Sequence, residues 1–418
     1  MISCTMPLFV RKLLDGYKDV ISINENASWL GYGSLICGIV FSQATLSAIV
    51  RTCPWSPSLS SLQRATASFD SKRFMKRLRS KILKYLKDKN IAEFCLVIDD
   101  TSIEKFSDNL PGFGKWATSS QNGYLGHKVL VVTIVNKKSG FAIPLFYKVL
   151  KKQDEREYEN YTTIILNVIN LLLAEGFPKF DIVIDSGFGA SNLLNELNQK
   201  GYTYVVEAKS NRKIKMSPNP KEAFKRPKQI FKIGKRSKVK YRNGKTKYIN
   251  EKLIYVKGIR KRQKGIAVYN YACAQDSFAY YITNNLNLTS SEMWFLSRDR
   301  WRIEQCFRDL KQNLSWGKLP CHTEGAFDFS ICIPFAIIVS LRIDAEKWNH
   351  ENTLSNQIGN MLRKIREENF RTAIGYIITN PNDKKITLLK NRRQKCRLTK
   401  KPVNSTAETK LKQYNNAT

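Results

Sequence analysis

The sequence predicts a mixed α/β protein whose sheet-based core follows a helical segment and is interrupted by a basic, strand-rich one. Three observations lead to this class. Between residues 93 and 209, apolar runs of strand length alternate with helical patterns, which is typical of a sheet covered by helices. Residues 1–90 show helical spacing and no clear strand pattern. Residues 206–265 combine short alternating segments with dense positive charge.

The helical segment comes first. Two helical patterns, residues 44–53 and 71–90, are separated by the turn-rich stretch PWSPSLSS. The second pattern has cations along one side and four apolar side chains along another: Phe74, Leu78, Ile82 and Tyr85. We interpret it first as an amphipathic packing helix and second as a DNA contact. We expect residues 1–90 to form a helical DNA-binding domain.

Strands and helices alternate in the next part. The stretch EFCLVIDDTS at 93–102 is an apolar run that ends in two acids, which is typical of a buried central strand. It is followed by a hairpin pattern at 123–150, a helical pattern at 161–177, and a strand, helix, strand pattern at 180–209. We expect residues 91–205 to form the first part of the core.

The core resumes after the basic segment. Strand patterns return at 267–289, and the letters TSSE at 289–292 have the form of a capping box at the start of a helix. We expect residues 281–350 to form the second part of the core. Residues 351–418 should then be a basic C-terminal region that is partly disordered.

The charge distribution indicates a polyanionic partner. The chain holds 70 Lys and Arg against 35 Asp and Glu, and its formal net charge is +35. Residues 206–265 alone hold 22 cations and three acids, a density that repels itself unless an anion neutralises it. We therefore expect residues 206–280 to be a basic β-rich insertion that contacts DNA. A merely charged, solvated surface is the alternative.

Other classes of partner and compartment are disfavoured. No stretch approaches the ~20 apolar residues of a spanning helix. The run ICIPFAIIVSL at 331–341 is short and contains a proline, so we expect a buried core helix and no membrane contact. No secretory signal is visible, which favours the cytoplasm. The nine cysteines lack CxxC spacing and the three histidines are far apart, so we expect reduced cysteines and no structural zinc site.

Three acidic positions carry the candidate chemistry. Asp99 or Asp100 and Asp185 each follow a buried strand, and Glu304 lies in a helical pattern. Each alone could be a strand-end turn, a helix cap or half of a salt bridge. Together, in a very basic protein, they favour a Mg²⁺ site, because Mg²⁺ prefers carboxylates, water and phosphate oxygens. Two such ions can serve the attacking and departing oxygens of phosphodiester cleavage.

The stretch RWRIEQCFRDLK at 300–311 allows two interpretations of its glutamate. Arg300, Glu304 and Lys311 project from nearly one helix face. The simpler interpretation is an i,i+4 salt bridge between Arg300 and Glu304, worth ~0.3–0.5 kcal/mol. The other is a metal ligand flanked by phosphate-binding cations. We expect the packing side of this helix to consist of four apolar residues: Trp301, Ile303, Phe307 and Leu310. His127 is expected in the core, outside the site.

The acidic motifs resemble those of the DDE transposases of bacterial insertion sequences, in the group with a Y-(2)-R-(3)-E-(6)-K signature. Arg300, Glu304 and Lys311 have the spacing of its last three members. The letters DDT at 99–101 and IDSGF at 184–188 correspond to the first two acidic motifs. The resemblance covers roughly residues 91–345. The signature tyrosine falls on Ser297, so its phosphate contact is missing or is supplied by another residue.

The resemblance implies an RNase H-like core and a set of site residues. The catalytic metal ligands would be Asp99, Asp185 and Glu304, holding two Mg²⁺ ions with Mn²⁺ as a substitute. Asp100 is the alternative to Asp99. Because adjacent strand residues face opposite sides, only one of the two points into the site, and the family's Asp-x-Thr form favours Asp99. The DNA-binding cations would be Arg300 and Lys311.

The function implied by the resemblance is cut-and-paste transposition. Mg²⁺-dependent cleavage at the element's ends, through a DNA hairpin as in relatives, would precede strand transfer into target DNA. The partners would be double-stranded DNA, as terminal inverted repeats and as target, and a second copy of the chain in a synaptic homodimer. The location would be the bacterial cytoplasm, in association with the nucleoid. Two alternatives are an RNase H-fold nuclease without strand transfer and a catalytically inactive or repurposed transposase-derived DNA-binding protein.

Overall fold

The structure is a computed structural model of the whole chain. The residues that it describes are 6, 8–21, 26–41, 45–53, 56–104, 110–116, 123–232, 234–240, 245–271, 279–319, 321–347, 362–367 and 371. Most of the predicted C-terminal region, 351–418, therefore lies outside the described residues.

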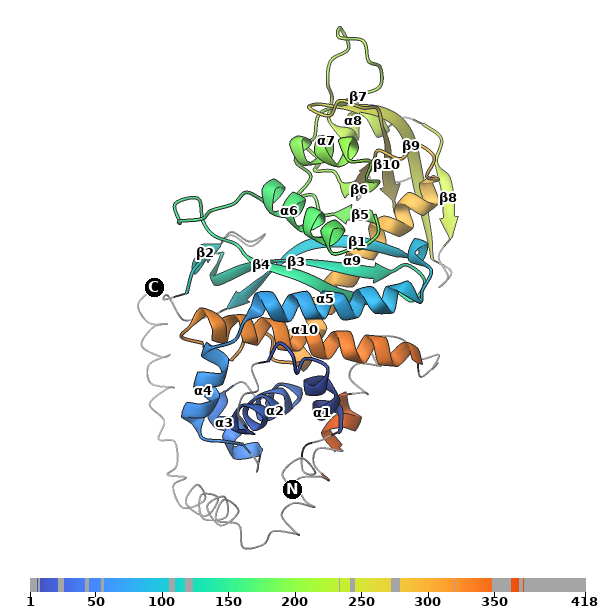
Figure 1. Cartoon of the computed structure of the whole chain (residues 1–418). Coiled ribbons are helices and arrows are strands. Elements are labelled where there is room, and N and C mark those ends of the chain that lie inside the picture. The colour runs from blue at the N-terminus through green and yellow to red at the C-terminus, as the bar shows by residue number, and fades with distance from the viewer. Residues whose placement is uncertain are drawn as a thin grey trace, which may run out of the picture.

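Eleven strands form one mixed sheet along the described chain (Figure 1). Their order is β2-β3-β1-β5-β6-β11-β10-β9-β7, with β4 beside β3 and β8 beside β9. The strands are β1 (Phe94–Glu104), β2 (Gly114–Trp116), β3 (Tyr124–Asn136), β4 (Ala142–Val149), β5 (Asp181–Ile184), β6 (Tyr204–Glu207), β7 (Ile214–Lys215), β8 (Ser237–Lys240), β9 (Thr246–Val256), β10 (Gln263–Tyr269) and β11 (Ala279–Thr283).

Five of these strands, in the order β4-β3-β1-β5-β6, form the core of the sheet. β3 pairs with β4 and with β1 in antiparallel fashion, whereas β1, β5 and β6 run parallel to one another. The predicted hairpin is present, and Gly140 supplies the positive φ of 73° that its turn requires. This order and these directions are those of an RNase H-like core, which confirms the predicted fold class.

The basic segment between residues 206 and 280 is β-rich, as predicted, and extends the same sheet. It holds β7 to β10 and the short helix α8 (Pro227–Phe231) among its described residues. β11 pairs with β6, β10 with β11, and β9 with β10, each antiparallel. The segment is thus an insertion in the sequence that continues the sheet in space. The boundaries that we predicted for separate domains stay a prediction.

Helices cover both faces of the sheet. They are α1 (Leu8–Asp15), α2 (Asn26–Val40), α3 (Leu46–Thr52), α4 (Leu59–Ala67), α5 (Ser71–Lys87), the 3₁₀ turn η2 (Ile91–Glu93), α6 (Tyr161–Ala174), α7 (Ser191–Gln199), α9 (Ser290–Asn313) and α10 (Glu324–Lys347). Figure 1 shows α5 and α10 side by side below the sheet, with α6 and α7 on its other side.

The N-terminal helices pack directly against the rest of the protein. α10 contacts α1, α4 and α5, and α5 also contacts β4. On α5, Phe74, Leu78 and Ile82 are fully buried, which confirms the packing interpretation of its apolar side. DNA contact by residues 1–90 stays a prediction.

Helix α10 is longer than the sequence suggested. Its stretch Glu324–Ile343 has a mean hydropathy of 1.9 over 20 residues, enough in length and composition to cross a membrane, and 78% of it is buried within the protein. The expectation that no stretch approaches this length was wrong, because the helix continues seven residues before the apolar run and passes through Pro334. Its burial agrees with the core helix that we expected.

Helix α9 begins with the capping box that the sequence predicts. The Thr289 hydroxyl accepts from the Glu292 amide at 3.2 Å, and the Glu292 carboxylate accepts from the Thr289 amide at 2.8 Å. The predicted packing side holds for Ile303, Phe307 and Leu310, which are buried. It was wrong for Trp301, whose exposed fraction is 42%, because residues two positions apart on a helix, such as Trp301 and Ile303, are about 200° apart around its axis.

A buried ion pair between α5 and the end of α6 generates a stability prediction. Arg79 donates to both carboxylate oxygens of Glu175, at 2.6 and 2.8 Å, and the side chains are 6% and 17% exposed. Glu175→Gln should lower the free energy of unfolding by about 3 kcal/mol, because it leaves a buried guanidinium without its counter-charge. Urea unfolding followed by circular dichroism would measure the loss.

The matched control for this prediction is Glu157→Gln. Glu157 also pairs with a cation, Lys151 at 2.8 Å, but its side chain is 74% exposed, so no measurable change is expected. Equal losses in the two variants would contradict the importance of burial.

Candidate active site

Strand β1 presents its two aspartates to opposite faces of the sheet. Asp99 faces α9: its Oδ2 lies 3.2 Å from Nη1 of Arg300, and its side chain is 13% exposed. Asp100 faces away from α9, where it pairs with Lys128 at 2.9 Å and accepts from the Tyr161 hydroxyl at 3.4 Å. The alternation of the strand therefore separates the two candidates, and it is Asp99 that lies with the other acids.

Asp185 lies in the turn directly after β5, the parallel neighbour of β1. The turn closes through a hydrogen bond from the Phe188 amide to the Asp185 carbonyl at 3.1 Å. Its side chain accepts from the Gly187 amide at 3.3 Å, and its Oδ1 lies 3.5 Å from Nη1 of Arg300. Because β1 and β5 are parallel, their carboxyl ends share one edge of the sheet, which brings Asp185 beside Asp99.

Helix α9 brings the third acid to the same edge. The Oε1 of Glu304 lies 2.9 Å from Nη1 of Arg300, one turn earlier on the helix. The simple i,i+4 salt bridge is thus present, yet the same nitrogen also contacts Asp99 and Asp185. Three carboxylates from β1, β5 and α9 converge on one cationic nitrogen.

A fourth acid, which we did not predict, completes the cluster. Glu207 is the last residue of β6, and its Oε2 lies 3.8 Å from Nε of Arg300. The signal was available in the sequence, since "YTYVVEAK" is another apolar strand that ends in an acid. We name Asp99, Asp185, Glu207 and Glu304 the acid cluster.

The protonation of the acid cluster reflects burial. Burial is the largest influence on Asp99 and raises its pKa to about 7, with Asp185 adding to the rise and Arg300 opposing it. Burial likewise raises the pKa of Glu207, and Asp185 and Glu304 contribute. Burial alone would lower the pKa of Arg300, but the surrounding carboxylates outweigh it and the pKa is raised. The carboxylates of the acid cluster and the guanidinium of Arg300 thus stabilise each other's charged forms.

The two predicted DNA-binding cations are both engaged within the protein. Arg300 lies in the acid cluster with 24% of its side chain exposed, on the helix face that it was expected to share with Glu304. The Lys311 ammonium donates to the Thr101 hydroxyl at 2.8 Å. Asp99 and Thr101 are two positions apart on β1, so the Asp-x-Thr motif turns both toward α9. DNA contact by Arg300 and Lys311 stays a prediction.

The donor set of the acid cluster suits a hard divalent cation. Carboxylate oxygens from separate elements already converge on a positive charge, as Mg²⁺ coordination requires. Within the described residues, however, no group of three or more acid, His or Cys side chains stands ready to hold a metal. The guanidinium of Arg300 lies between the carboxylates, so they would have to close in around an ion.

Residues that we placed outside the site lie outside it. His127 is fully buried and packs against Phe113 and Phe327, with ring centroids 5.6 and 4.6 Å away. The cysteines that the structure describes are buried and lie outside any disulfide: Cys37, Cys53, Cys95, Cys306, Cys321 and Cys332.

Ser297, at the position of the signature tyrosine, is also buried, and its hydroxyl donates to the Trp294 carbonyl at 2.7 Å. A phenol nevertheless lies nearby, on β11. The ring of Tyr281 is 5.7 Å from that of Trp294. Burial raises the pKa of Tyr281 to about 12, Glu207 adds to the rise, and a hydrogen bond with Ser297 opposes it.

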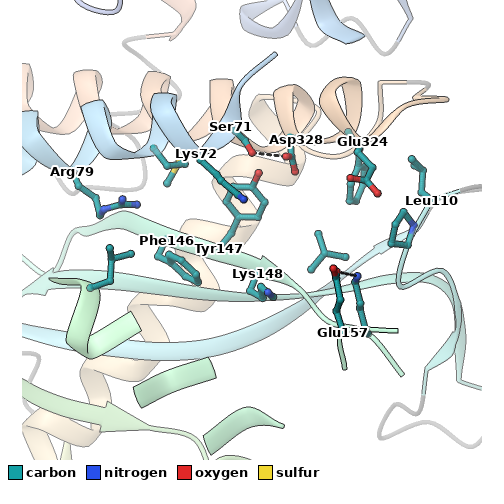
Figure 2. A pocket seen from close by; sticks show the side chains of 16 residues that line it. Ser71, Lys72, Arg79, Leu110, Phe146, Tyr147, Lys148, Glu157, Glu324 and Asp328 are labelled. Carbon is teal, nitrogen blue, oxygen red and sulfur yellow. Dashed lines mark hydrogen bonds and ion pairs between the residues drawn. The ribbon is translucent and has the colours of Figure 1, made fainter. Parts of the chain in front are cut away.

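A separate pocket of about 540 Å³ lies between α5, α10 and β4 (Figure 2). Tyr147 stands at its centre, and Lys72, Lys148 and Glu324 line it. The Ser71 hydroxyl donates to Asp328 at 2.5 Å on its helical side. No member of the acid cluster lines this pocket, so the pocket is not the candidate site.

Comparison with known proteins identifies one family. The model of the family described as "Transposase DDE domain" matches residues 94–339. No curated protein matches the chain. Among solved structures, the cryo-EM structure of the piggyBac transposase synaptic complex with hairpin DNA is similar, with a TM-score of 0.45 and 11% sequence identity. That similarity covers 94% of this chain and 84% of the other.

The raised pKa of Asp99 generates a prediction about pH. An aspartate in the unfolded chain loses its proton near pH 4, whereas Asp99 and the buried Asp299 of α9 keep theirs to about pH 7 in the folded protein. Between these values the folded state binds more protons, so the free energy of unfolding falls as pH rises. Each group contributes at most ~1.4 kcal/mol per pH unit.

Urea unfolding in metal-free buffer at several pH values between 4 and 7 would measure this decline. Asp99→Asn should make it shallower, whereas Asp88→Asn, at an exposed helix end, should leave it as in the wild type. A wild-type stability that rises with pH over this interval would contradict the burial of Asp99.

Proposed function

This chain belongs to the DDE transposase family, because the family model matches more than half of the chain. We propose that the chain cleaves and joins DNA through the acid cluster. The observation that carries the proposal is the convergence of Asp99, Asp185 and Glu304 on Nη1 of Arg300, within 3.5 Å. Three acids far apart in the sequence meet at one edge of an RNase H-like sheet.

The acids would hold the metal that the chemistry needs. Asp99, Asp185 and Glu304 would bind two Mg²⁺ ions, with Mn²⁺ as a substitute, since three carboxylates and a phosphate balance two divalent charges. When bound, the ions activate the attacking oxygen and stabilise the departing one. β1, the turn after β5 and α9 supply one carboxylate each, which would orient the substrate phosphate for in-line attack.

Cations on α9 and the outer sheet would bind the DNA. Lys311 contacts Thr101, which lies two residues after Asp99 on β1. It would therefore be within reach of a phosphate beside the scissile one. Arg300 would bind phosphate with its planar fork once it leaves the acid cluster. Tyr281 on β11 is the candidate for the contact that the signature tyrosine makes in relatives, because its side chain is hydrogen-bonded to Ser297 and its ring packs against Trp294.

The finer assignment follows the resemblance of the motifs. We propose a bacterial insertion-sequence transposase of the Y-(2)-R-(3)-E-(6)-K group, acting by cut and paste with a hairpin at the element's ends. Terminal inverted repeats and target DNA would be its substrates, a synaptic homodimer its working form, and the nucleoid-containing cytoplasm its location. The R-(3)-E-(6)-K spacing and the acid cluster support this assignment.

Ser297 favours one alternative, a repurposed transposase-derived DNA-binding protein without catalysis. The intact acid cluster favours an enzyme. An RNase H-fold nuclease would use the same acids but release cut ends without insertion products. The cleavage experiment below distinguishes the three, because it measures binding, cutting and joining separately.

Glu304→Gln should abolish Mg²⁺-dependent cleavage of a DNA fragment that carries the element's own end. Loss of a metal ligand removes several kcal/mol of transition-state stabilisation, equivalent to at least ~10³-fold in rate. Binding to the fragment should persist, since it depends on cations. Gel analysis of end-labelled DNA, with and without target plasmid, would follow binding, cleavage and insertion.

The matched pair for this assay is Asp99→Asn and Asp100→Asn. Asp99 lies in the acid cluster and Asp100 on the opposite face of the same strand, so only the first should match the loss in Glu304→Gln. A wild type that binds the end but never cuts it, with Mn²⁺ tried as well, would favour the DNA-binding alternative.

Exposed lysines on β8 generate a prediction about DNA affinity. Lys238 and Lys240 alternate with the buried Val239, so they point to the same outer side of an edge strand. If both contact phosphates, Lys238→Gln/Lys240→Gln should reduce the slope of log affinity against log salt by about 1.8, that is ~0.9 per contact. Fluorescence anisotropy at several salt concentrations would measure the slope.

The control is Lys179→Gln/Lys200→Gln. These lysines are exposed beside the amino end of β5, at the edge opposite to Asp185, and their replacement should leave the slope unchanged. Equal slopes in both double variants and the wild type would show that β8 does not contact DNA.

A further inference from the structure

We propose that Arg300 is an exchangeable counter-ion of the acid cluster, which divalent ions displace onto Glu207 before DNA is cut. The inference rests on the proposed function, because it concerns the metal site of that reaction. It assigns a role to Glu207, which the motifs of the family resemblance do not include, and it makes Arg300 a positioning residue instead of a permanent DNA contact.

The first step is geometric. Nη1 of Arg300 lies 2.9, 3.2 and 3.5 Å from carboxylate oxygens of Glu304, Asp99 and Asp185. Oxygens that bind Mg²⁺ directly lie at about 2.0–2.1 Å from it, so these oxygens would have to move inward by about 1–1.5 Å into the space of that nitrogen. Nη1 and a metal ion therefore compete for the same carboxylates.

The second step concerns charge. Four carboxylates surround one guanidinium, and the side chains of Asp99 and Arg300 are 13% and 24% exposed. The guanidinium keeps its charge at any pH that a protein tolerates, so it neutralises part of the cluster whenever no other cation is there. Replacing one positive charge with two or four strengthens the attraction, which gives divalent ions the advantage at sufficient concentration.

The third step concerns the second edge of the guanidinium. Glu207 approaches Nε, at 3.8 Å, whereas the other three acids approach Nη1. Glu207 lies on β6, one strand further from β1 than Asp185 is. A rotation that withdraws Nη1 from the other acids can therefore keep, or tighten, the contact between Nε and Glu207. The two Nη groups then become available to a phosphate.

The experiment measures Mn²⁺ binding to the full chain without DNA, by electron paramagnetic resonance of free Mn²⁺. Arg300→Gln should bind Mn²⁺ at least ~10-fold more tightly than the wild type, because the competing cation is gone. Glu207→Gln should bind it several-fold more weakly, because displaced Arg300 loses its acceptor. In the double variant, Glu207→Gln should add no further effect, since the two residues act as one unit.

The outcomes separate the inference from the proposed function. Equal Mn²⁺ affinity in wild type and Arg300→Gln would overturn the exchange, while leaving the metal site intact. A loss caused by Glu207→Gln that persists in the double variant would make Glu207 a ligand and overturn its proposed role. Absence of Mn²⁺ binding in every variant, including a wild type whose fold is verified by circular dichroism, would overturn the metal site itself.

Arg300→Gln leaves four carboxylates facing one another, which should lower the stability of the metal-free variant. Thermal unfolding in EDTA and in Mn²⁺ tests this directly: the variant should gain more stability from Mn²⁺ than the wild type does. Arg300→Lys serves as a second variant, since it keeps the charge without the fork, and it should bind Mn²⁺ with an affinity between those of wild type and Arg300→Gln. A Lys variant that binds more weakly than the wild type would contradict the competition.

Discussion

The contact between one guanidinium and four carboxylates is the constraint on which the site depends. Arg300 connects β1, β5, β6 and α9, because each contributes one acid to it. Without a cation at this point, the carboxylates would repel one another or take up protons. The contact that neutralises the acid cluster is therefore also a contact that holds α9 against the sheet.

The parallel strands explain why the acids can meet at all. β1, β5 and β6 are adjacent and point the same way, so acids at their carboxyl ends lie along one edge. The antiparallel additions, β3 on one side and β11 on the other, bury these three strands within a wide sheet. Helix α9 then closes the edge from one face, with its capping box fixing where the helix starts.

Much of this arrangement could be predicted from local patterns, and the rest could not. Apolar runs that end in acids gave Asp99 and Asp185, and the helical spacing around Glu304 put its carboxylate near Arg300, because these signals act within a few residues. The partner of Arg300 across the sheet depends on tertiary packing, which the helix face alone does not specify. Glu207 was visible by the same strand-end rule but lies in a strand that opens the basic segment, where the excess of lysine and arginine dominated the interpretation. Trp301 was misassigned because neighbours in a motif need not share a face of the helix.

The contrast between the acid cluster and the rest of the molecule bears on the order of binding. A net charge of +35 would draw a polyanion such as DNA to the surface, yet four carboxylates that share a single positive charge would repel its phosphates. Cations must enter the cluster with the phosphate or before it. Because Arg300 is itself the resident cation, its release in the proposed exchange would supply a phosphate-binding group at the moment the site gains its metal charge. In the free protein, Arg300 would partly neutralise the four acids. The site would attract the scissile phosphate only after metal ions have added their positive charge.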